Sequence, residues 1–162
     1  MITEATPGEV DRDAIVEAVL SASRVLVAVA ARSLGDVAEE VTLTQYRTLV
    51  VLASRGPQSL AALAEAVDVT PPTATRMCDR LLRKGLIVRR HDRADRRLIR
   101  LTLAKKGHEL VDAVTGRRRA EIAHLLEAIP YEQQAALVDS LQRLTAAAGE
   151  VPEQDWSTGW DL

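Results

Sequence analysis

The sequence contains no phenylalanine, one cysteine, and only two tryptophans and two tyrosines among its 162 residues. The lone Cys78 excludes an intrachain disulfide, so nothing in the chain requires an oxidising compartment. The N-terminal sequence lacks a basic segment followed by an apolar core, and no uninterrupted apolar run reaches the roughly 18 residues of a membrane span. We therefore expect a soluble, cytoplasmic protein without a signal peptide and without membrane contact.

Side chains arranged for catalysis are also scarce. The three histidines, His91, His108 and His124, do not have a metal-ligand spacing. No nucleophile has a neighbouring base, and no glycine-rich loop could hold a phosphate. The sequence thus predicts neither an enzyme nor a metal or cofactor site.

Apolar residues, in contrast, are abundant and make up 47% of the sequence. With alanine and leucine on the packing faces, they predict one mainly α-helical domain.

The charges are unevenly distributed along the chain. The net charge is −2, yet the segment 76–106 contains twelve Lys or Arg and three Asp, a net charge of +9 that leaves −11 elsewhere. A basic segment on an acidic body is typical of a protein that binds a polyanion such as DNA. The alternative is a solvated helix face, although such faces normally mix the two signs. A protein-binding adaptor would gain nothing from this concentration of charge.

Apolar periodicity and turn residues predict the order of the structural elements. Residues 1–10 are expected to form a flexible arm. The predicted elements that follow are a long helix at about 11–34, a second helix capped by Thr44, a short third helix capped by Ser59, a fourth helix from Pro71 to Gly85, a β-hairpin at 86–103, a long helix at about 105–129 and a final helix at about 131–148.

The predicted fourth helix and hairpin carry most of the basic residues. The helix has an apolar stripe with spacings of three and four residues, formed by Ala74, Met77, Cys78, Leu81 and Leu82. Cys78 is therefore expected to be a buried packing residue, with a redox switch as the weaker alternative. In the hairpin, Ile99, Leu101 and Leu103 alternate with polar residues, as in a half-buried strand.

A short helix, a tight turn, a basic helix and a basic hairpin in this order resemble a winged helix-turn-helix. In such modules the second helix of the pair enters the DNA major groove. Arg76 and Arg80 lie one turn apart on the outward face, so either can make a bidentate contact to guanine. The DNA-binding residues predicted on this helix are Thr70, Pro71, Pro72, Thr73, Thr75, Arg76 and Arg80.

The hairpin tip narrows the resemblance to one family. The run HDRADRRLIRLTLAKKG is similar to the wing of the MarR (multiple-antibiotic-resistance regulator) family, whose Asp-x-x-Asp-Arg-Arg pattern is matched by Asp92, Asp95, Arg96 and Arg97. The resemblance implies that Arg97 enters the minor groove, oriented by a salt bridge to Asp95, while Arg96 contacts phosphates. A narrow minor groove concentrates negative potential and attracts arginine. The predicted DNA-binding residues of the wing are Arg93, Asp95, Arg96 and Arg97.

The resemblance covers roughly residues 11–148. It implies a DNA-binding lobe at about 41–104 and dimerisation helices at about 11–34 and 105–148, which would pair two copies on a palindromic operator. The alternative is that these helices form a bundle within one chain. Residues 149–162 are expected to form a flexible tail, unless Trp156 or Trp160 docks on the body. One departure is Ala104, which stands where the family usually has a capping Thr, so the next helix is expected to begin frayed or shifted.

The family resemblance further implies a small aromatic or phenolic ligand that releases a repressor from its operator. Arg24, Tyr46, Arg47 and Val50 are near the implied ligand site, between the DNA-binding lobe and the dimerisation helices, although core or surface roles are the alternative. The triplet Arg117–Arg119 is expected to be a solvated face, to pair with the acidic N-terminal arm, or to line an anion pocket. The sequence as a whole predicts a ligand-responsive transcriptional repressor that acts as a homodimer.

Overall fold

The computed structural model describes residues 11–39, 41–92, 95–153 and 156. The arm predicted at residues 1–10 lies outside the described residues, as does most of the tail. The elements in chain order are α1 (Arg12–Leu34), the 3-10 helix η1 (Gly35–Glu39), α2 (Leu43–Arg55), α3 (Leu60–Ala66), α4 (Pro71–Arg83), β1 (Ile87–His91), β2 (Ile99–Leu103), α5 (Lys105–Leu126) and α6 (Tyr131–Ala147). The mainly α-helical fold with one β-hairpin is the predicted one.

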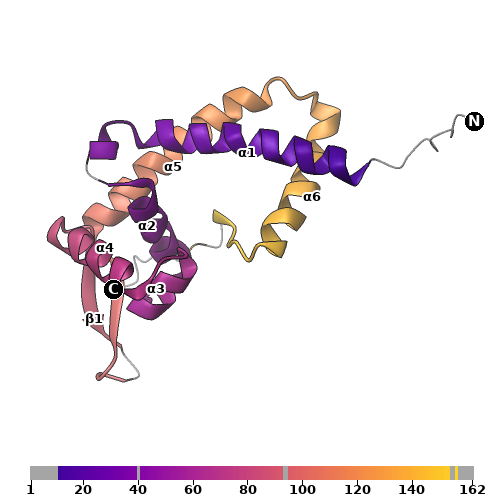
Figure 1. Cartoon of the computed structure of the whole chain (residues 1–162). Coiled ribbons are helices and arrows are strands. Elements are labelled where there is room, and N and C mark those ends of the chain that lie inside the picture. The colour runs from indigo at the N-terminus through magenta and orange to yellow at the C-terminus, as the bar shows by residue number, and fades with distance from the viewer. Residues whose placement is uncertain (1–10, 40, 93–94, 154–155, 157–162) are drawn as a thin grey trace, which may run out of the picture.

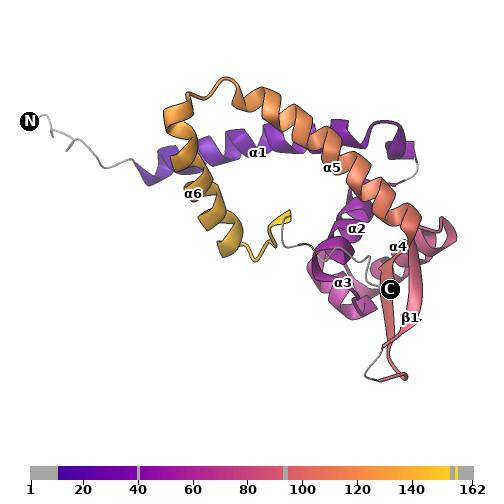
Figure 2. The same ribbon diagram turned by 180° about the vertical axis from the view of Figure 1, so that it is seen from behind.

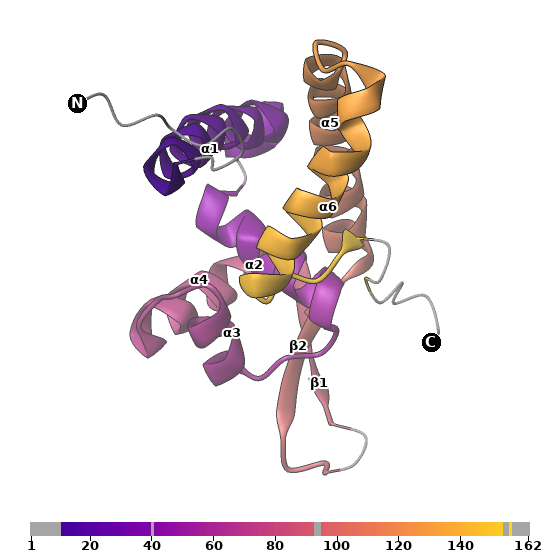
Figure 3. The same cartoon turned by 90° about the vertical axis from the view of Figure 1, so that its right-hand side faces the viewer.

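The elements gather into two groups. α2, α3, α4 and the hairpin lie at one end of the molecule, and α1, α6 and the second half of α5 lie at the other (Figure 1). The view from behind shows α5 running from the hairpin to the α6 end and crossing α1 (Figure 2). The hairpin projects beyond the helices as a separate wing (Figure 3). α5 is therefore the element that connects the two groups.

The core lies in the lobe formed by α2, α3, α4, the hairpin and the first half of α5. Its most buried side chains come from every one of these elements, including Leu49, Leu63, Leu81, Ile87 and Val111, each at most 2% exposed. On α4 the predicted stripe is confirmed, because Ala74, Met77, Cys78 and Leu81 are buried and Leu82 is partly buried. The wing and α4 thus share one core and are held in a fixed relation.

Of the caps predicted for α2 and α3, one is confirmed and one is wrong. Ser59 caps α3 as predicted, since its hydroxyl accepts the N–H of Ala62 at 3.2 Å. The predicted cap at Thr44 is wrong. Thr42 and Gln45 form a capping box in which each side chain accepts the other's backbone N–H, at 3.3 and 3.1 Å. This reciprocal pair satisfies two helix-end donors at once, so α2 begins two residues earlier.

The wing is anchored to the lobe through one isolated β-bridge. β1 and β2 pair antiparallel, with Ile87 opposite Leu103. Gln58, before α3, forms a bridge with Leu101 through N–H to carbonyl bonds of 3.0 and 2.7 Å. Leu101 and Leu103 are buried as predicted, but Ile99 is 55% exposed. Ile99 lies toward the tip, where the hairpin has passed beyond the lobe.

The start of α5 is positioned by backbone packing. The helix begins at Lys105, so the shift expected from Ala104 does not occur. The N–H of Ala104 donates to the carbonyl of Leu86 at 3.0 Å. Gly107, one turn into the helix, lies so close that a Cβ there would approach the same carbonyl oxygen to 2.1 Å. This close approach takes over the positioning that a capping threonine would provide.

Much of the other helix group remains uncovered. α6 buries none of its described residues, and α1 buries only Val29, Ser33 and Leu34. By length and composition α1 could cross a membrane, because only Glu17 and Arg24 are charged across its middle. The large exposed aliphatic residues of α1, α5 and α6 are Ile15, Val16, Val19, Leu20, Val25, Leu26, Val27, Leu125, Leu126, Val138, Leu141 and Leu144. Among the described residues, the helices therefore do not form the self-contained bundle considered as an alternative.

Replacing Gly107 tests the close approach at the start of α5. We expect Gly107→Ala to lower the free energy of unfolding by about 2 kcal/mol, because a backbone carbonyl cannot move aside as a side chain can. Gly116→Ala is the control in the same helix, since a Cβ there meets nothing within 4 Å, and it should raise stability by about 0.5 to 1 kcal/mol. Urea unfolding at one protein concentration measures both. Equal stability of the two variants would contradict the account.

Candidate nucleic-acid interface

α4 turns its polar face to solvent. The predicted contact residues on this helix, Thr70, Pro71, Pro72, Thr73, Thr75, Arg76 and Arg80, are all exposed. Thr70 occupies the N-cap position, but its hydroxyl lies 2.9 Å from the hydroxyl of Thr73 and does not cap a backbone N–H. The Thr75 hydroxyl donates to the carbonyl of Pro71 at 3.0 Å. The structure therefore brings the predicted residues together on one accessible surface.

The two arginines on this surface are unpaired within the described part of the chain. Neither Arg76 nor Arg80 forms a side-chain hydrogen bond or ion pair with any residue that the structure describes. The nearby acid, Asp79, is bound to Arg89 of β1, with an Oδ1 to Nη2 distance of 2.9 Å. This pair joins α4 to the wing. It also removes the one carboxylate of α4 that could have neutralised the outward arginines.

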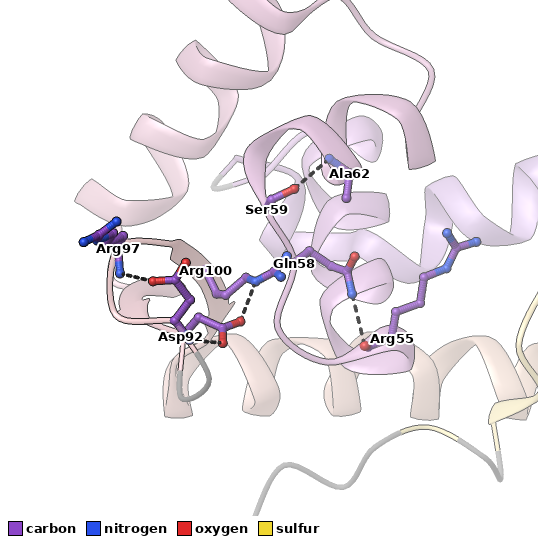
Figure 4. A network of polar contacts seen from close by, with 8 residues as sticks. Arg55, Gln58, Ser59, Ala62, Asp92, Arg97 and Arg100 are labelled. Atoms are coloured by element: carbon purple, nitrogen blue, oxygen red, sulfur yellow. Dashed lines mark hydrogen bonds and ion pairs between the residues drawn. The ribbon is translucent and has the colours of Figure 1, made fainter.

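A network of carboxylates shapes the wing tip (Figure 4). Asp92 accepts from the Nε of Arg100 at 2.9 Å and from the backbone N–H of Asp95 at 3.2 Å. The Leu98 N–H donates to the carbonyl of Asp95 at 2.9 Å and closes a turn. Asp92 thus ties strand β2 to the turn.

The salt bridge expected between Asp95 and Arg97 does not form. The Asp95 carboxylate instead accepts the backbone N–H of Arg97 at 2.9 Å, which is the common geometry of an aspartate beginning a turn. Asp95 therefore fixes the backbone from which Arg97 projects. The side chains of Arg96 and Arg97 are exposed and unpaired among the described residues, while Arg93 lies outside them. In Figure 4 the Arg97 side chain points away from the pair of Asp92 and Arg100.

Cys78 lies beneath this surface as a packing residue. It is 2% exposed, and burial raises the pKa of its thiol to about 11. The thiol is therefore protonated at neutral pH and a poor target for oxidants. Between α3, α4 and the wing, Cys78 contributes to the floor of a pocket of about 250 Å³, which the exposed Ile99 also lines. The prediction of a packing role is confirmed.

The residues implied for ligand binding are only partly brought together. On α2, Tyr46 and Val50 are buried, and the Tyr46 hydroxyl lies 3.3 Å from that of Thr115 on α5. Burial raises the pKa of the Tyr46 phenol, which stays neutral. Arg47 binds Glu150. Arg24 stands apart on α1, where its guanidinium donates to Ser21 at 2.9 Å.

Each arginine of the triplet on α5 has a defined place. Arg117 donates to the carbonyl of Ser33 at 2.8 Å, near the end of α1. Arg118 lies over the Tyr46 ring, with 5.5 Å from its guanidinium carbon to the ring centroid. Arg119 binds Glu153 at 2.7 Å. Arg117 and Arg119 are exposed, as expected of a solvated face, whereas Arg118 is partly buried. The sequence did not predict these contacts, because the partners lie far away along the chain.

The sequence left open whether Trp156 or Trp160 docks on the body, and in the structure Trp156 does. Its indole N–H donates to the carbonyl of Val151 at 3.1 Å, and its ring packs against the hydrophobic core. Trp160 lies outside the described residues. In the sequence, the tail stands out only because it contains both tryptophans, and this does not indicate where a tryptophan ring docks.

The fold and this basic surface define a winged helix-turn-helix protein, and comparison with known proteins identifies the family. A family model for the MarR family matches residues 41–99. The HTH-type transcriptional repressor MdtR of Bacillus subtilis (strain 168) is 32% identical over 119 residues, 74% of this chain and 77% of the relative. The chain belongs to the MarR family, and it is a transcriptional regulator.

Solved structures agree with this assignment. The crystal structure of RV1404 from Mycobacterium tuberculosis is 41% identical with a TM-score of 0.78, covering 90% of this chain and 99% of that one. A mutant of MepR from S. aureus, bound to an oligodeoxyribonucleotide, is 22% identical with a TM-score of 0.57, covering 86% and 99%. The second likeness supports the winged-helix fold alone.

Proposed function

We propose that this protein is a cytoplasmic repressor that binds a palindromic DNA operator as a homodimer and releases it when a small aromatic or phenolic ligand binds. The observation that carries DNA binding is the set of exposed arginines on α4 and the wing that pair with none of the residues placed by the structure: Arg76, Arg80, Arg96 and Arg97. The name of the relative MdtR, a repressor, and the oligodeoxyribonucleotide on MepR support the proposal.

The proposed docking places α4 in the major groove and the wing tip over the minor groove. Arg76 and Arg80 reach guanine edges, and Thr70, Thr73 and Thr75 contact phosphates or bases. The rings of Pro71 and Pro72 pack on thymine methyl groups. Arg97 enters the minor groove from the backbone that Asp95 holds, and Arg93 and Arg96 contact phosphates.

The proposed dimer covers the apolar surface of α1, α5 and α6. These helices leave large aliphatic side chains about half exposed, more than a soluble chain normally leaves contiguous and uncovered. A two-fold axis would bury them and place two α4 helices about 34 Å apart, one turn of DNA. We accordingly assign 41–104 to DNA binding, 11–34 and 105–148 to dimerisation, and 149–162 to a C-terminal tail.

The proposed ligand site lies between α2 and α5. Tyr46 and Val50 supply apolar surface, and Arg47 supplies charge. Arg24 joins the proposed site on the family resemblance. A ligand here would bind between the element that supports α4 and the helix that reaches the dimer interface, so it could select a spacing of the two lobes that no longer fits the operator.

Two arginine variants separate base reading from groove binding. Arg76→Ala should lose about 1 to 3 kcal/mol of discrimination at one position of each half-site, because a bidentate contact to guanine is removed. Arg97→Ala should weaken binding to all sequences alike. Arg12→Ala, an exposed arginine at the far end of α1, is the control. Mobility-shift assays on DNA flanking the gene measure all three, and parental behaviour of both variants would rule out the proposed docking.

A charge in the uncovered apolar surface tests the dimer. Leu141 is 45% exposed on α6, and we expect Leu141→Asp to give monomers and to lower DNA affinity by at least about tenfold, since both half-sites then bind independently. Gln142→Asp adds the same charge at the next, exposed position and should leave the dimer intact. Light scattering should find twice the 17.7 kDa chain mass in the parent. A monomeric parent would refute the dimer.

A further inference from the structure

The chain returns from α6 to the DNA-binding lobe through a short acidic segment. Gly149, with φ of +67°, turns the chain at the end of α6. Figure 1 shows the segment that follows, in yellow, coming back toward α2. The Glu150 carboxylate then binds Arg47 of α2 through two parallel bonds, 2.9 Å to Nη1 and 2.5 Å to Nη2. Bidentate pairs of this kind are among the stronger polar contacts in proteins.

Two further contacts hold this segment in place. The Glu153 carboxylate accepts from Arg119 of α5 at 2.7 Å. Trp156 is half-buried against the lobe and bonded back to Val151. Residues 150–153 and Trp156, called the strap below, therefore connect the end of α6 to both α2 and α5.

The surface beneath the strap has more positive charge than the strap neutralises. Three arginines lie there, Arg47 on α2 and Arg118 and Arg119 on α5, against the carboxylates of Glu150 and Glu153. Of these three, Arg118 is the one that binds no described carboxylate. Its Nε is buried and has no hydrogen-bond partner among the described residues, although the guanidinium lies over the Tyr46 ring. A buried donor without an acceptor is costly, so a ligand that supplies an acceptor beside Arg118 would gain an interaction that the strap does not provide.

We propose that the strap is an internal occupant of the ligand site, and that an aromatic carboxylate binds there by displacing Glu150 from Arg47. The ligand carboxylate would take the place of the Glu150 carboxylate, and its ring would lie toward Tyr46 and Arg118. This inference rests on the proposed ligand site between α2 and α5. Because the strap links α6 to α2, its release removes one of the connections between the dimerisation helices and the DNA-binding lobe.

The placement of the tryptophans allows a direct test in the full chain. Both tryptophans of the protein, Trp156 and Trp160, lie after α6, so Trp160→Phe leaves Trp156 as the single reporter of the strap. Acrylamide quenching of its fluorescence measures its exposure. We expect benzoate to increase the quenching severalfold, and benzamide, which has the same ring without the charge, to leave it unchanged.

A matched pair of variants in the same background tests the role of Glu150. Glu150→Gln should expose Trp156 without ligand and lower the benzoate concentration needed for half-saturation by about fivefold, because a charge-assisted pair no longer competes. Glu132→Gln, an exposed glutamate of α6, should change neither value. If Trp156 is equally quenched in the parent, in Glu150→Gln and with benzoate, the strap is not displaced and the inference fails.

Mobility shifts on the same samples keep this inference separate from the proposed function. If benzoate weakens DNA binding while Trp156 stays protected from acrylamide, the proposed ligand-responsive repressor is supported and displacement of the strap is contradicted. Benzoate that exposes Trp156 without changing DNA affinity would support the strap and contradict release of the operator by ligand.

Discussion

Burial of one stripe of α4 determines what the opposite face of that helix can do. Ala74, Cys78 and Leu81 are at most 2% exposed and pack into a core shared with α2, α3, the wing and α5. Burying each leucine-sized side chain contributes about 1.5 to 3 kcal/mol, and rotating the helix would exchange these residues for arginines. The helix is therefore fixed in rotation, and Arg76 and Arg80 remain on the outside.

The carboxylates of the basic segment act within the scaffold. Asp79 joins α4 to β1, and Asp92 joins the turn of the wing to β2. Each exposed pair contributes little to stability, but together they orient the wing relative to α4. Over the ranges that the structure describes, the same arrangement leaves the outward arginines without an internal anion, and such side chains are free to bind a polyanion that releases its counterions.

Local sequence patterns predicted most of the fold. They failed where the contact that fixes the structure joins residues distant in sequence, or where a neighbouring residue caps the helix instead of the predicted one. The α4 stripe and Ser59 cap followed from spacing and residue type alone. The prediction of Thr44 as a cap is wrong, because the reciprocal hydrogen bonds of Thr42 and Gln45 fix the helix start two residues earlier. The backbone contact of Gly107 with Leu86 could not be foreseen, because it depends on how β1 and α5 meet.

In the candidate site, too, the features set by local sequence patterns were predictable and the contacts between distant segments were not. The exposed face of α4 and the accessible wing were predictable from periodicity. The contacts of Asp79 with Arg89, Glu150 with Arg47 and Trp156 with the core join segments whose proximity exists only in the folded chain.

The central claim, that the unpaired arginines of α4 and the wing bind DNA phosphates and grooves, is tested most directly by the salt dependence of DNA affinity. Each neutralised phosphate contributes a slope of about −0.9 in log K against log salt. The account predicts a slope of about −4 or steeper for the parent, and a slope shallower by about 2 for Arg96→Ala, which removes one phosphate contact from each protomer. An affinity that does not change with salt would contradict it.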